Sequence, residues 1–506
     1  MNAVPRGSQG SRRAAWLVVT GVMLTALLES LDTTVVNVAL PHMMGSFGAT
    51  PDQITWMITS YLISTAIVMP LTGYLVRRFG RRRVLYIGVG SFILMSGACG
   101  LSWSLASMVI FRFFQGAFGA VLVPISQSIM MEAFPLERRN QAMAIWGLAI
   151  MVGPVLGPVL GGVITEYWDW RWVFFINVPI GIVAMIMMAE DVGGAPADRS
   201  VATDWGGLIL LSLALGAFQT LLDQGHTRDW FESSFIWVLA WLAGSSLLLF
   251  VARALGRQQN IIDVRLFADR NFAAGNLLMA GYGMAMYSTI VLWPLLAQDV
   301  FGYPADTAGW VLAPRGVVSA VMMILISIFV ARRVDNRWLI GIGMLVSAFA
   351  ASMMANLSLD ADRFALVAPG LVLGLGMALV FSQLSAATFE TIPPDKSAEA
   401  AGLHNLMRTI GGSIGIAITS TLLVRREQVH WHHLSEHVTP TNALLHQWSE
   451  RAGIFLSTPS GPARLVTELF QHVQMGAFVD VFSYITLLFT VLAPAVLLLR
   501  HRGRSG

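Results

Sequence analysis

The chain of 506 residues is 55% hydrophobic and only 12% charged, with a mean hydropathy of +0.66 and a formal net charge of +3. Soluble domains carry about twice that share of charged residues, so a soluble fold is excluded. The single cysteine, Cys99, excludes intramolecular disulfides and argues against a cysteine-based metal site. We expect an all-α integral membrane protein.

Apolar stretches of about 20 residues, the length that crosses a bilayer as a helix, recur fourteen times along the chain. They cover residues 15–40, 53–76, 84–103, 105–131, 140–166, 171–190, 204–223, 233–254, 272–298, 307–331, 338–357, 363–388, 399–424 and 476–499. Most arginines fall in segments that face the cytoplasm if both termini are inside, as the positive-inside rule requires. The first stretch is too long for a signal peptide, so we expect it to be retained.

A weak internal repeat divides these stretches into two halves. Displaced by 258 residues, the chain places Gly116 on Gly374, Glu132 on Glu390, Pro135 on Pro393, Gly153 on Gly411 and Gly157 on Gly415. Two halves of equal orientation are the parallel-repeat plan of major facilitator transporters, with six spans in each half. We expect a cytoplasmic tail (1–14), an N-terminal six-helix bundle (15–190), a linker (191–203), two inserted helices (204–254), a second linker (255–271), a C-terminal six-helix bundle (272–499) with an outward loop (425–475), and a tail (500–506).

Two acidic residues, Glu29 and Asp32, lie inside the first apolar stretch. A charge at membrane depth costs roughly 2.5–3.5 kcal/mol on insertion scales, so such residues usually serve a function. Their i, i+3 spacing places both on one helical face, where they can share a proton. Arg112, in the fourth stretch, is either a structural partner of a carbonyl or lipid headgroup or the cation that pairs with one of these acids. We predict that Asp32, Glu29 and Arg112 couple transport to protons.

Several motifs together resemble one family. Leu31–Pro41 resembles the first-helix motif of fourteen-span drug:proton antiporters of the major facilitator superfamily. Further resemblances are the loop motif (Gly73, Arg77, Arg78, Gly80, Arg81, Arg82), the fourth-span motif (Arg112, Gln115, Gly116), the antiporter motif (Gly153, Pro154, Gly157, Pro158, Gly161, Gly162) and Phe175–Gly181. The resemblance extends over about residues 20 to 490 and is closest to the EmrB branch of the EmrB/QacA subfamily.

The resemblance implies a proton-coupled multidrug exporter that works by alternating access, with protons as the coupling ion and no cofactor. Glycines every four residues in the antiporter motif allow close helix packing, which is either simply structural or a flexible, proton-tight hinge. Arg77 stands where the superfamily's loop motif usually has Asp. Any charge pairing made by that Asp must therefore be absent or rebuilt, and the sequence alone predicts that Arg77→Asp is tolerated or mildly activating.

The substrate is expected near the midplane between the two halves, among apolar walls that carry a few polar anchors. The candidate lining residues are Asn37, Tyr61, Gln115, Gln127, Tyr287, Trp293, Gln383, His404, Asn405 and Arg408. In the second half, Arg315 and Arg408 either hold a substrate anion or shift a carboxylate, or they pair with Asp480 or Glu399. His404 is either a proton relay or, as we prefer, a packing residue.

Six of the ten histidines lie between His430 and His472, in the long segment that span parity places outside. No acidic or cysteine residues stand at metal spacing around them, so we interpret this segment as a folded extracytoplasmic element or docking surface and not as a metal site. In the EmrB branch the resemblance implies a periplasmic membrane-fusion adaptor that feeds an outer-membrane channel. The expected location is the bacterial cytoplasmic (inner) membrane, with both termini cytoplasmic.

The other function classes are less well supported by the sequence. The only lysine is Lys396, so no phosphate-binding loop of the Gly-x-x-x-x-Gly-Lys type exists, and no zinc-protease motif or nucleophile elbow occurs. The basic balance implies no nucleic-acid partner, because the arginines lie in loops. The partners we expect are amphipathic small molecules and the lipid bilayer. The alternatives are a proton-coupled transporter of a specific metabolite, lipid or siderophore and, less favoured, a non-transporting membrane sensor.

Overall fold

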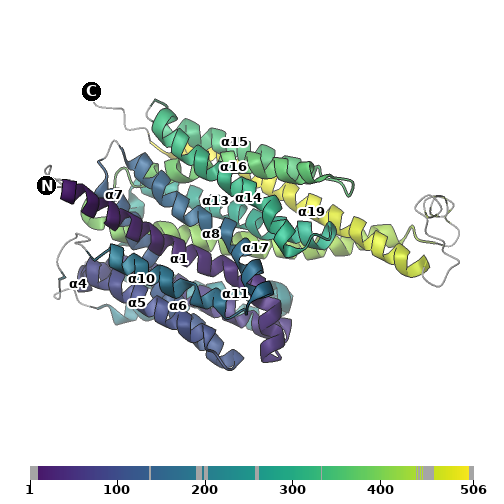
Figure 1. The fold of residues 1–506 in the computed structure, drawn as a ribbon, viewed down its shortest axis with the longest axis horizontal. Helices are drawn as coiled ribbons and strands as arrows, with labels where there is room; N and C mark the ends of the chain where they lie inside the picture. Colours follow the sequence, from purple (N-terminus) through teal and green to yellow (C-terminus); the bar gives the residue numbers. More distant parts are fainter. Residues whose placement is uncertain are drawn as a thin grey trace.

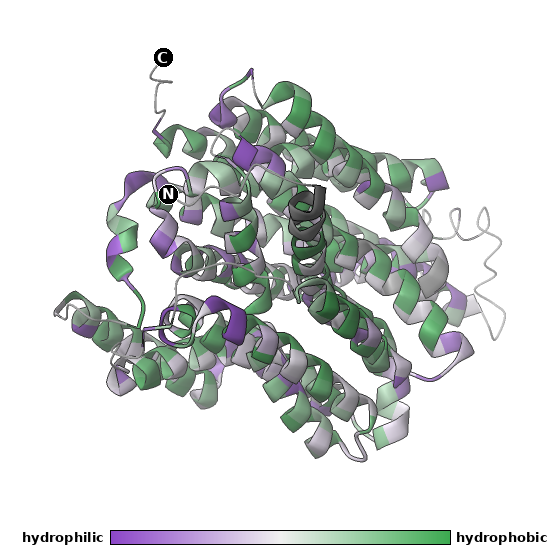
Figure 2. Ribbon diagram, turned by 60° about the vertical axis from the view of Figure 1, so that its left-hand side comes forward, coloured by the Kyte–Doolittle hydropathy of each residue, from purple (hydrophilic) through white to green (hydrophobic). Residues whose placement is uncertain are grey.

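The computed structural model describes residues 9–135, 138–189, 197–198, 203–256, 261–331, 333–439, 442, 445, 447, 449 and 461–500, and the regular structure of these residues is entirely helical. A bilayer offers backbone amides no hydrogen-bond partner, so long apolar stretches form helices that satisfy their N–H groups internally. Twelve helices among the described residues are long and apolar enough to cross a membrane. Figure 2 shows hydrophobic residues predominating along the helices, with hydrophilic ones mainly toward helix ends and connections.

The first half of the chain supplies six of the expected helical segments. They are α1 (Gln9–Phe47), α3 (Trp56–Val68) continued by α4 (Thr72–Phe79), α5 (Arg81–Gly100), α6 (Leu105–Gly119) continued by α7 (Leu122–Ala133), α8 (Arg139–Tyr167), and α9 (Trp172–Phe175) continued by α10 (Asn177–Met187). A short α2 (Pro51–Ile54) precedes α3. The two expected spans that are not among these twelve correspond to α8 and to the shorter apolar segment Trp172–Met187.

The second half repeats this arrangement after two further helices. It consists of α13 (Arg270–Leu295), α14 (Ala305–Leu325), α15 (Asn336–Ala355), α16 (Arg363–Thr388), α17 (Ser397–Ser435) and α19 (Gly461–Ala495). A π-helical turn extends α13 (Leu296–Val300) and another extends α14 (Ile326–Val330). The start of α1 and the end of α19 lie toward the same end of the molecule (Figure 1).

Side-chain caps fix where several helices begin. The Ser104 hydroxyl accepts from the Ser107 amide while the Ser107 hydroxyl accepts from the Ser104 amide, and this capping box separates α5 from α6 at the shortest predicted boundary. The Asp269 carboxylate caps α13 through the Phe272 amide at 2.8 Å. The Asp362 carboxylate caps α16 in the same way, because the first amides of a helix have no acceptor within the helix.

Glycines bring equivalent helices together in both halves. A Cβ at Gly153 of α8 would lie 2.2 Å from the Ser30 hydroxyl of α1, and one at Gly411 of α17 would lie 2.0 Å from the Ala280 carbonyl of α13. The same holds for α6 on α3 and for α16 on α14, where Gly116 meets the Tyr61 carbonyl and Gly374 meets the Arg315 carbonyl. The glycines that align in the sequence repeat therefore perform the same close packing in each bundle.

The two helices between the halves pack as a pair. α11 (Trp205–Gly225) lies against α12 (Ser234–Gly256) and contacts both α3 and α17. The Thr59 hydroxyl donates to the Asp223 carboxylate, and Trp230 Nε1 donates to the Thr421 hydroxyl at 2.9 Å. α12 lies farther out, with Trp241 72% and Leu248 73% exposed. The pair thus touches one helix of each bundle from the periphery. The linkers on either side, 191–203 and 255–271, are only partly within the described residues.

Both ends of the segment expected as an outward loop (425–475) are helical where the structure describes them. α17 continues to Ser435 and α19 begins at Gly461, so both helices are longer than the apolar stretches from which they were predicted. Figure 1 shows them extending beyond the other helices. His430 Nε2 of α17 bonds the Asp480 carboxylate of α19 at 2.9 Å, and the Trp431 and Phe470 rings meet edge to face. Hydropathy missed this extension because its helical turns are polar and lie outside the apolar core.

Candidate functional site

The carboxylate of Asp32 lies at the centre of a buried polar network in the N-terminal bundle. Arg112 Nη1 donates to Asp32 Oδ2 at 2.6 Å, and Gln115 Nε2 donates to Asp32 Oδ1 at 2.9 Å. Asp32 is 1% exposed, Arg112 2% and Gln115 0%. Breaking a buried pair of this kind costs about 3–5 kcal/mol, because it leaves an uncompensated charge. The Asp32 carboxylate is therefore fixed in place by these donors in this conformation.

The sequence analysis missed a third donor to this carboxylate. Asn177 Nδ2 donates to Asp32 Oδ1 at 2.8 Å and also to the Ser96 hydroxyl at 3.0 Å. The Ser96 hydroxyl donates in turn to the Phe174 carbonyl at 2.9 Å, which fixes the orientation of the group. Asn177 stands inside the motif Phe175–Gly181, so a polar residue at membrane depth within that motif was the available signal.

Arg112 is held from its flat face as well as from its edge. Its guanidinium carbon lies 4.1 Å from the centroid of the Tyr61 ring, within cation–π distance. The Tyr61 hydroxyl and Arg112 Nε have no hydrogen-bond partner among the described residues. Tyr61 and Gln115, which we expected to line a cavity, are therefore part of the network around Asp32.

Glu29 differs from its neighbour Asp32. It is half-buried and makes no hydrogen bond or ion pair within the described part of the chain. The cation that acts on it most strongly is Arg408 of α17, in the other bundle. Glu29 therefore belongs to the interface between the bundles, whereas Asp32 belongs to the interior of one bundle.

The C-terminal bundle holds two buried cations, Arg315 of α14 and Arg408 of α17, which are 7% and 4% exposed. The Tyr282 hydroxyl of α13 lies within electrostatic range of both. Neither arginine pairs with the acids that the sequence offered, because Asp480 binds His430 and Arg426, and Glu399 binds Arg77. Gln383 of α16 is fully buried, and neither atom of its amide finds a partner among the described residues.

His404 and Asn405 have defined partners. His404 Nδ1 lies 3.2 Å from Asn276 Oδ1, and its Nε2 lies 3.3 Å from the Ser385 hydroxyl. With Nδ1–H donating and Nε2 accepting, the ring is satisfied as a neutral imidazole, which agrees with a packing role. Asn405 Nδ2 donates to Gln127 Oε1 at 2.6 Å and so joins the two bundles.

Three of the expected lining residues lie elsewhere. Asn37 is exposed, and its amide donates only to the Thr33 carbonyl one turn back. Trp293 packs edge to face on Phe482 of α19, at 5.6 Å between ring centroids, and so faces the interior of its own bundle. The Tyr287 ring lies against Gly412, where an added Cβ would approach it to 2.6 Å. The sequence could not show these orientations, because each residue lies on a helix that is apolar on several faces.

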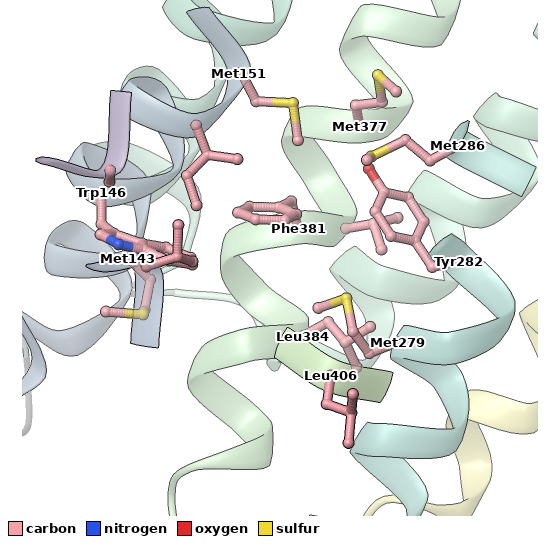
Figure 3. Close-up of a cluster of buried hydrophobic side chains, with 14 of the residues drawn as sticks. Met143, Trp146, Met151, Met279, Tyr282, Met286, Met377, Phe381, Leu384 and Leu406 are labelled. Carbon is pink, nitrogen blue, oxygen red and sulfur yellow. The ribbon is translucent and has the colours of Figure 1, made fainter. Parts of the chain in front are cut away.

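The interface between the bundles at the level of α8 and α16 is rich in methionine. Figure 3 shows Phe381 of α16 between side chains of α8 on one side and of α13 on the other. Phe381 stacks on Trp146 at 5.9 Å and an interplanar angle of 14°. We call the buried residues around it the methionine cluster; its members are Met143, Trp146, Met151, Met279, Tyr282, Met286, Met377, Phe381, Leu384 and Leu406. Unbranched methionine side chains adapt to differently shaped neighbours.

The antiporter-motif glycines pack α8 closely on α1. A Cβ at Gly157 would lie 2.1 Å from the Thr34 hydroxyl, and one at Gly161 would lie 2.8 Å from the Val35 carbonyl. Gly162 faces away and would meet nothing within 4 Å. The side chains of Pro154 and Pro158 lie outside the described part of the structure. Structural packing is therefore present here, and the hinge role stays a prediction.

The loop motif joins the two bundles at the end of the molecule where α4 meets α5. Arg77 forms an ion pair with Glu399 of α17, and Gly73 lies directly against the Glu399 side chain. Arg77 thus makes a charge pair that links the two bundles. We call this the loop-motif end.

Further contacts reinforce the loop-motif end. Arg81 binds Glu132 through two nitrogens at 2.6 and 2.8 Å, and the Ser397 hydroxyl of α17 donates to the same carboxylate at 2.6 Å. Gly80 has a φ of 83°, which a side chain would strain, and this conformation allows the sharp turn between α4 and α5. Arg78 and Arg82 lie near the rings of Phe79 and Tyr86. In this conformation the bundles are joined at the loop-motif end.

No group of three or more metal-ligating side chains occurs among the residues that the structure describes. His430 binds Asp480, and His432 lies 3.1 Å from Glu436 on the same helix. The histidines of α17 thus act within and between the two extended helices.

Comparison with known proteins agrees with this architecture. Residues 22–416 match the family described as Major Facilitator Superfamily. Two solved structures share the fold: the human organic anion transporter MFSD10 (TM-score 0.62, 16% identity, covering 95% of this chain and 99% of that one) and an inward-facing bacterial homolog of the lysosomal transporter Spinster (TM-score 0.58, 18% identity, covering 98% and 100%). The chain belongs to the major facilitator superfamily and is a multi-span membrane transporter, not an enzyme.

Within that superfamily its relatives form a narrower group. The chain is 34% identical to the fatty acid resistance protein FarB of Neisseria gonorrhoeae over 97% of both sequences. It is 36% identical to the multidrug export protein EmrB of Haemophilus influenzae, covering 85% of this chain and 84% of that protein. Identity to the multidrug export protein EmrB of Escherichia coli is 35%, covering 84% and 83%. The resemblance to the EmrB branch is thereby confirmed.

Proposed function

We propose that the protein is a secondary active transporter that exports amphipathic, mostly hydrophobic compounds in exchange for protons. The observation that carries the proposal is the buried ion pair of Asp32 and Arg112, with Gln115 and Asn177 as further donors. Contacts with these three donors occupy both oxygens of the Asp32 carboxylate in this conformation. A conformational change that loosens them lets Asp32 take up a proton, which couples the transport cycle to the proton gradient.

Relatives and the bundle interface support a broad range of substrates. Two relatives are named multidrug export proteins and one a fatty acid resistance protein. The methionine cluster supplies an apolar interface between the bundles that can repack around different shapes. Polar anchors are few, so hydrophobic burial, which is non-directional, would provide most of the affinity.

Alternating access follows from the contacts at the loop-motif end. Arg77–Glu399 and Arg81–Glu132–Ser397 hold the bundles together there. For substrate to enter from that side, the contacts of Glu399 and Ser397 with the first bundle must break. We propose that this end faces the cytoplasm of a bacterial inner membrane, that both termini are cytoplasmic, and that the described conformation is closed toward the cytoplasm.

The extended helices suit an adaptor. α17 and α19 project from the end opposite the loop motif and are held together by His430–Asp480 and the Trp431–Phe470 ring contact. Val466 and Phe470 are 52% and 46% exposed on this projection. Apolar side chains on a helical pair outside the membrane suit a protein partner. We propose that a membrane-fusion adaptor docks here and connects the transporter to an outer-membrane channel.

Transport of a fluorescent amphipathic dye into inverted membrane vesicles tests the proposal. Energised vesicles should accumulate the dye against its gradient, and an uncoupler should abolish the accumulation. Several dyes of unrelated shape should behave alike, whereas a transporter of one metabolite would handle only its own substrate and a sensor would move none. Dye uptake that persists without a proton gradient would refute proton coupling.

A further inference from the structure

Three buried side chains of the C-terminal bundle carry polar groups that lack a partner within the described part of the chain. Arg315 Nη1, Arg408 Nε and Nη1 and the Tyr282 hydroxyl have no hydrogen-bond partner there. These side chains are at most 7% exposed. Buried polar groups are almost always satisfied, so unsatisfied ones on α13, α14 and α17 indicate a partner that is not part of the chain.

The charges in this region do not balance within the bundle. Arg315 and Arg408 contribute two cations, and the Tyr282 hydroxyl lies within electrostatic range of both. The acids considered as partners are engaged elsewhere: Asp480 binds His430, and Glu399 binds Arg77. Glu29 acts on Arg408 from across the interface but makes no ion pair in the part of the chain that the structure describes. A buried cation needs an anion, so the missing partner is negatively charged.

The side chains around Arg408 indicate the chemical character of the rest of the missing ligand. The guanidinium carbon of Arg408 lies 5.8 Å from the ring centroid of Phe381, the aromatic residue at the centre of the methionine cluster. Tyr282 belongs to that cluster, and the hydroxyl end of its ring lies beside Met286 (Figure 3). Donors and cations therefore border an apolar, adaptable surface. A ligand that satisfies both must have an oxyanion at one end and an apolar body at the other.

We propose that Arg315, Arg408 and Tyr282 form an anion subsite that binds the carboxylate of an amphiphilic organic acid, with the apolar body of the ligand in the methionine cluster. This inference rests on the proposed export function and narrows its substrate class. Arginine donors recognise a carboxylate by charge and by direction, and the Tyr282 hydroxyl can also donate to it. Neutral and cationic amphiphiles lack the group that these donors need.

The subsite also has a counterpart in the other bundle. Gly153 contacts Ser30 of α1, and its counterpart Gly411 contacts Ala280 of α13, so Ser30 and Ala280 occupy equivalent positions. Two residues further along each helix, Tyr282 therefore occupies the position equivalent to that of Asp32. The glycine contacts likewise place Arg315 of α14 where Tyr61 stands on α3. The N-terminal bundle satisfies its cation Arg112 with its own acid, and the C-terminal bundle has a tyrosine in the place of that acid. The anion that balances the C-terminal bundle must therefore come from outside it.

Equilibrium binding to the full chain in lipid nanodiscs tests the subsite. The probes are dodecanoate, dodecanol and dodecyltrimethylammonium, which share a chain length and differ in charge, with partition into empty nanodiscs subtracted. The protein should bind dodecanoate about tenfold more tightly than dodecanol, the difference expected of one charge-assisted hydrogen-bonded contact. Arg315→Gln and Arg408→Gln should each remove most of that preference, and Arg408→Lys should restore part of it.

Two further variants keep the test interpretable. Tyr282→Phe removes only a hydroxyl, so it should fold normally and reduce the preference by about threefold, less than loss of a charged donor. Arg333→Gln removes an exposed arginine in the same half of the chain and should leave the preference unchanged. Equal binding of dodecanoate and dodecanol, or a full preference in both buried-arginine variants, would overturn the subsite. Because proton-driven dye uptake is measured separately, its loss would refute the proposed function without touching this result.

Discussion

The two bundles share a scaffold and differ in how they treat charge. In the first, α8 packs on α1 and α6 on α3 through glycines, and the acid Asp32 is bound by Arg112 and two amides. In the second, α17 packs on α13 and α16 on α14 through the matching glycines, but Arg315 and Arg408 have no internal acid. We infer from this comparison that the two bundles have different roles. The N-terminal bundle holds the titratable carboxylate of Asp32, and the C-terminal bundle presents the donors of Arg315 and Arg408 to a ligand.

We expect the largest effect from removing the carboxylate of Asp32, the feature that distinguishes the first bundle from the second. Asp32→Asn keeps the size of the side chain and one acceptor for Arg112, but it removes the group that changes charge. We expect proton-driven export to be abolished, because no other carboxylate occupies this network, while substrate binding persists. Uphill dye transport in proteoliposomes measures the effect. Dye binding by Asp32→Asn equal to that of the unmodified protein would exclude misfolding as the cause.

Glycine substitutions test the shared scaffold. Gly157→Ala places a methyl group 2.1 Å from the Thr34 hydroxyl, so α8 must move away from α1. Overpacking of this kind costs about 1–3 kcal/mol, and we expect a lower melting temperature and severely reduced transport. Gly162→Ala is the matched control on the same helix, since nothing lies within 4 Å of its Cβ. Equal behaviour of the two variants would show that close packing of α8 on α1 is not required.

Charge reversal at Arg77 tests whether the loop-motif end opens and closes during transport. Arg77→Glu sets two carboxylates against each other beside the buried Glu399, which should open this end and reduce export by roughly tenfold. The ion pair also reverses the expectation from sequence for Arg77→Asp, which should now be harmful. The swap of Arg77→Glu with Glu399→Arg should recover most of the activity. Accessibility of a cysteine introduced nearby reports the opening, and failure of the swap to recover either readout would argue against a gate here.

The smallest effect is expected at His404. Its two ring nitrogens lie within hydrogen-bond distance of Asn276 and Ser385, so we expect the side chain to pack inside its bundle and to take no part in charge transfer. His404→Gln preserves much of that hydrogen bonding and should change proton-driven dye uptake by less than about twofold, within the usual effect of a conservative core change. A loss comparable to that of Asp32→Asn would make the second bundle a proton carrier as well.

Sequence reasoning was most informative where membrane physics is most restrictive. The fourteen apolar stretches became helices because a bilayer allows few other structures, and Asp32 with Arg112 stood out because charge at that depth is costly. The fold class followed from the same constraints together with the motifs.

The remaining features depend on contacts between distant residues. Arg77 and Glu399 are separated by 322 positions, and no local pattern connects them. Asn177 is a common polar residue whose role depends on the position of Asp32 in a neighbouring helix. Trp293 was expected to line the cavity, yet its ring faces Phe482, because its apolar helix does not reveal its orientation. The extended ends of α17 and α19 are polar and escaped hydropathy.

Substrate-induced proton release tests the central claim most directly. The full chain in nanodiscs, in weakly buffered solution, is mixed with a transported dye while a soluble pH indicator reports released protons. Exchange requires that the proton carried by Asp32 leaves as substrate binds and the contact with Arg112 forms again. The account therefore predicts that the unmodified protein releases protons on binding, and that Asp32→Asn binds the dye but releases none. Proton release from Asp32→Asn equal to that of the unmodified protein would contradict the assignment of the coupling site to the Asp32 network.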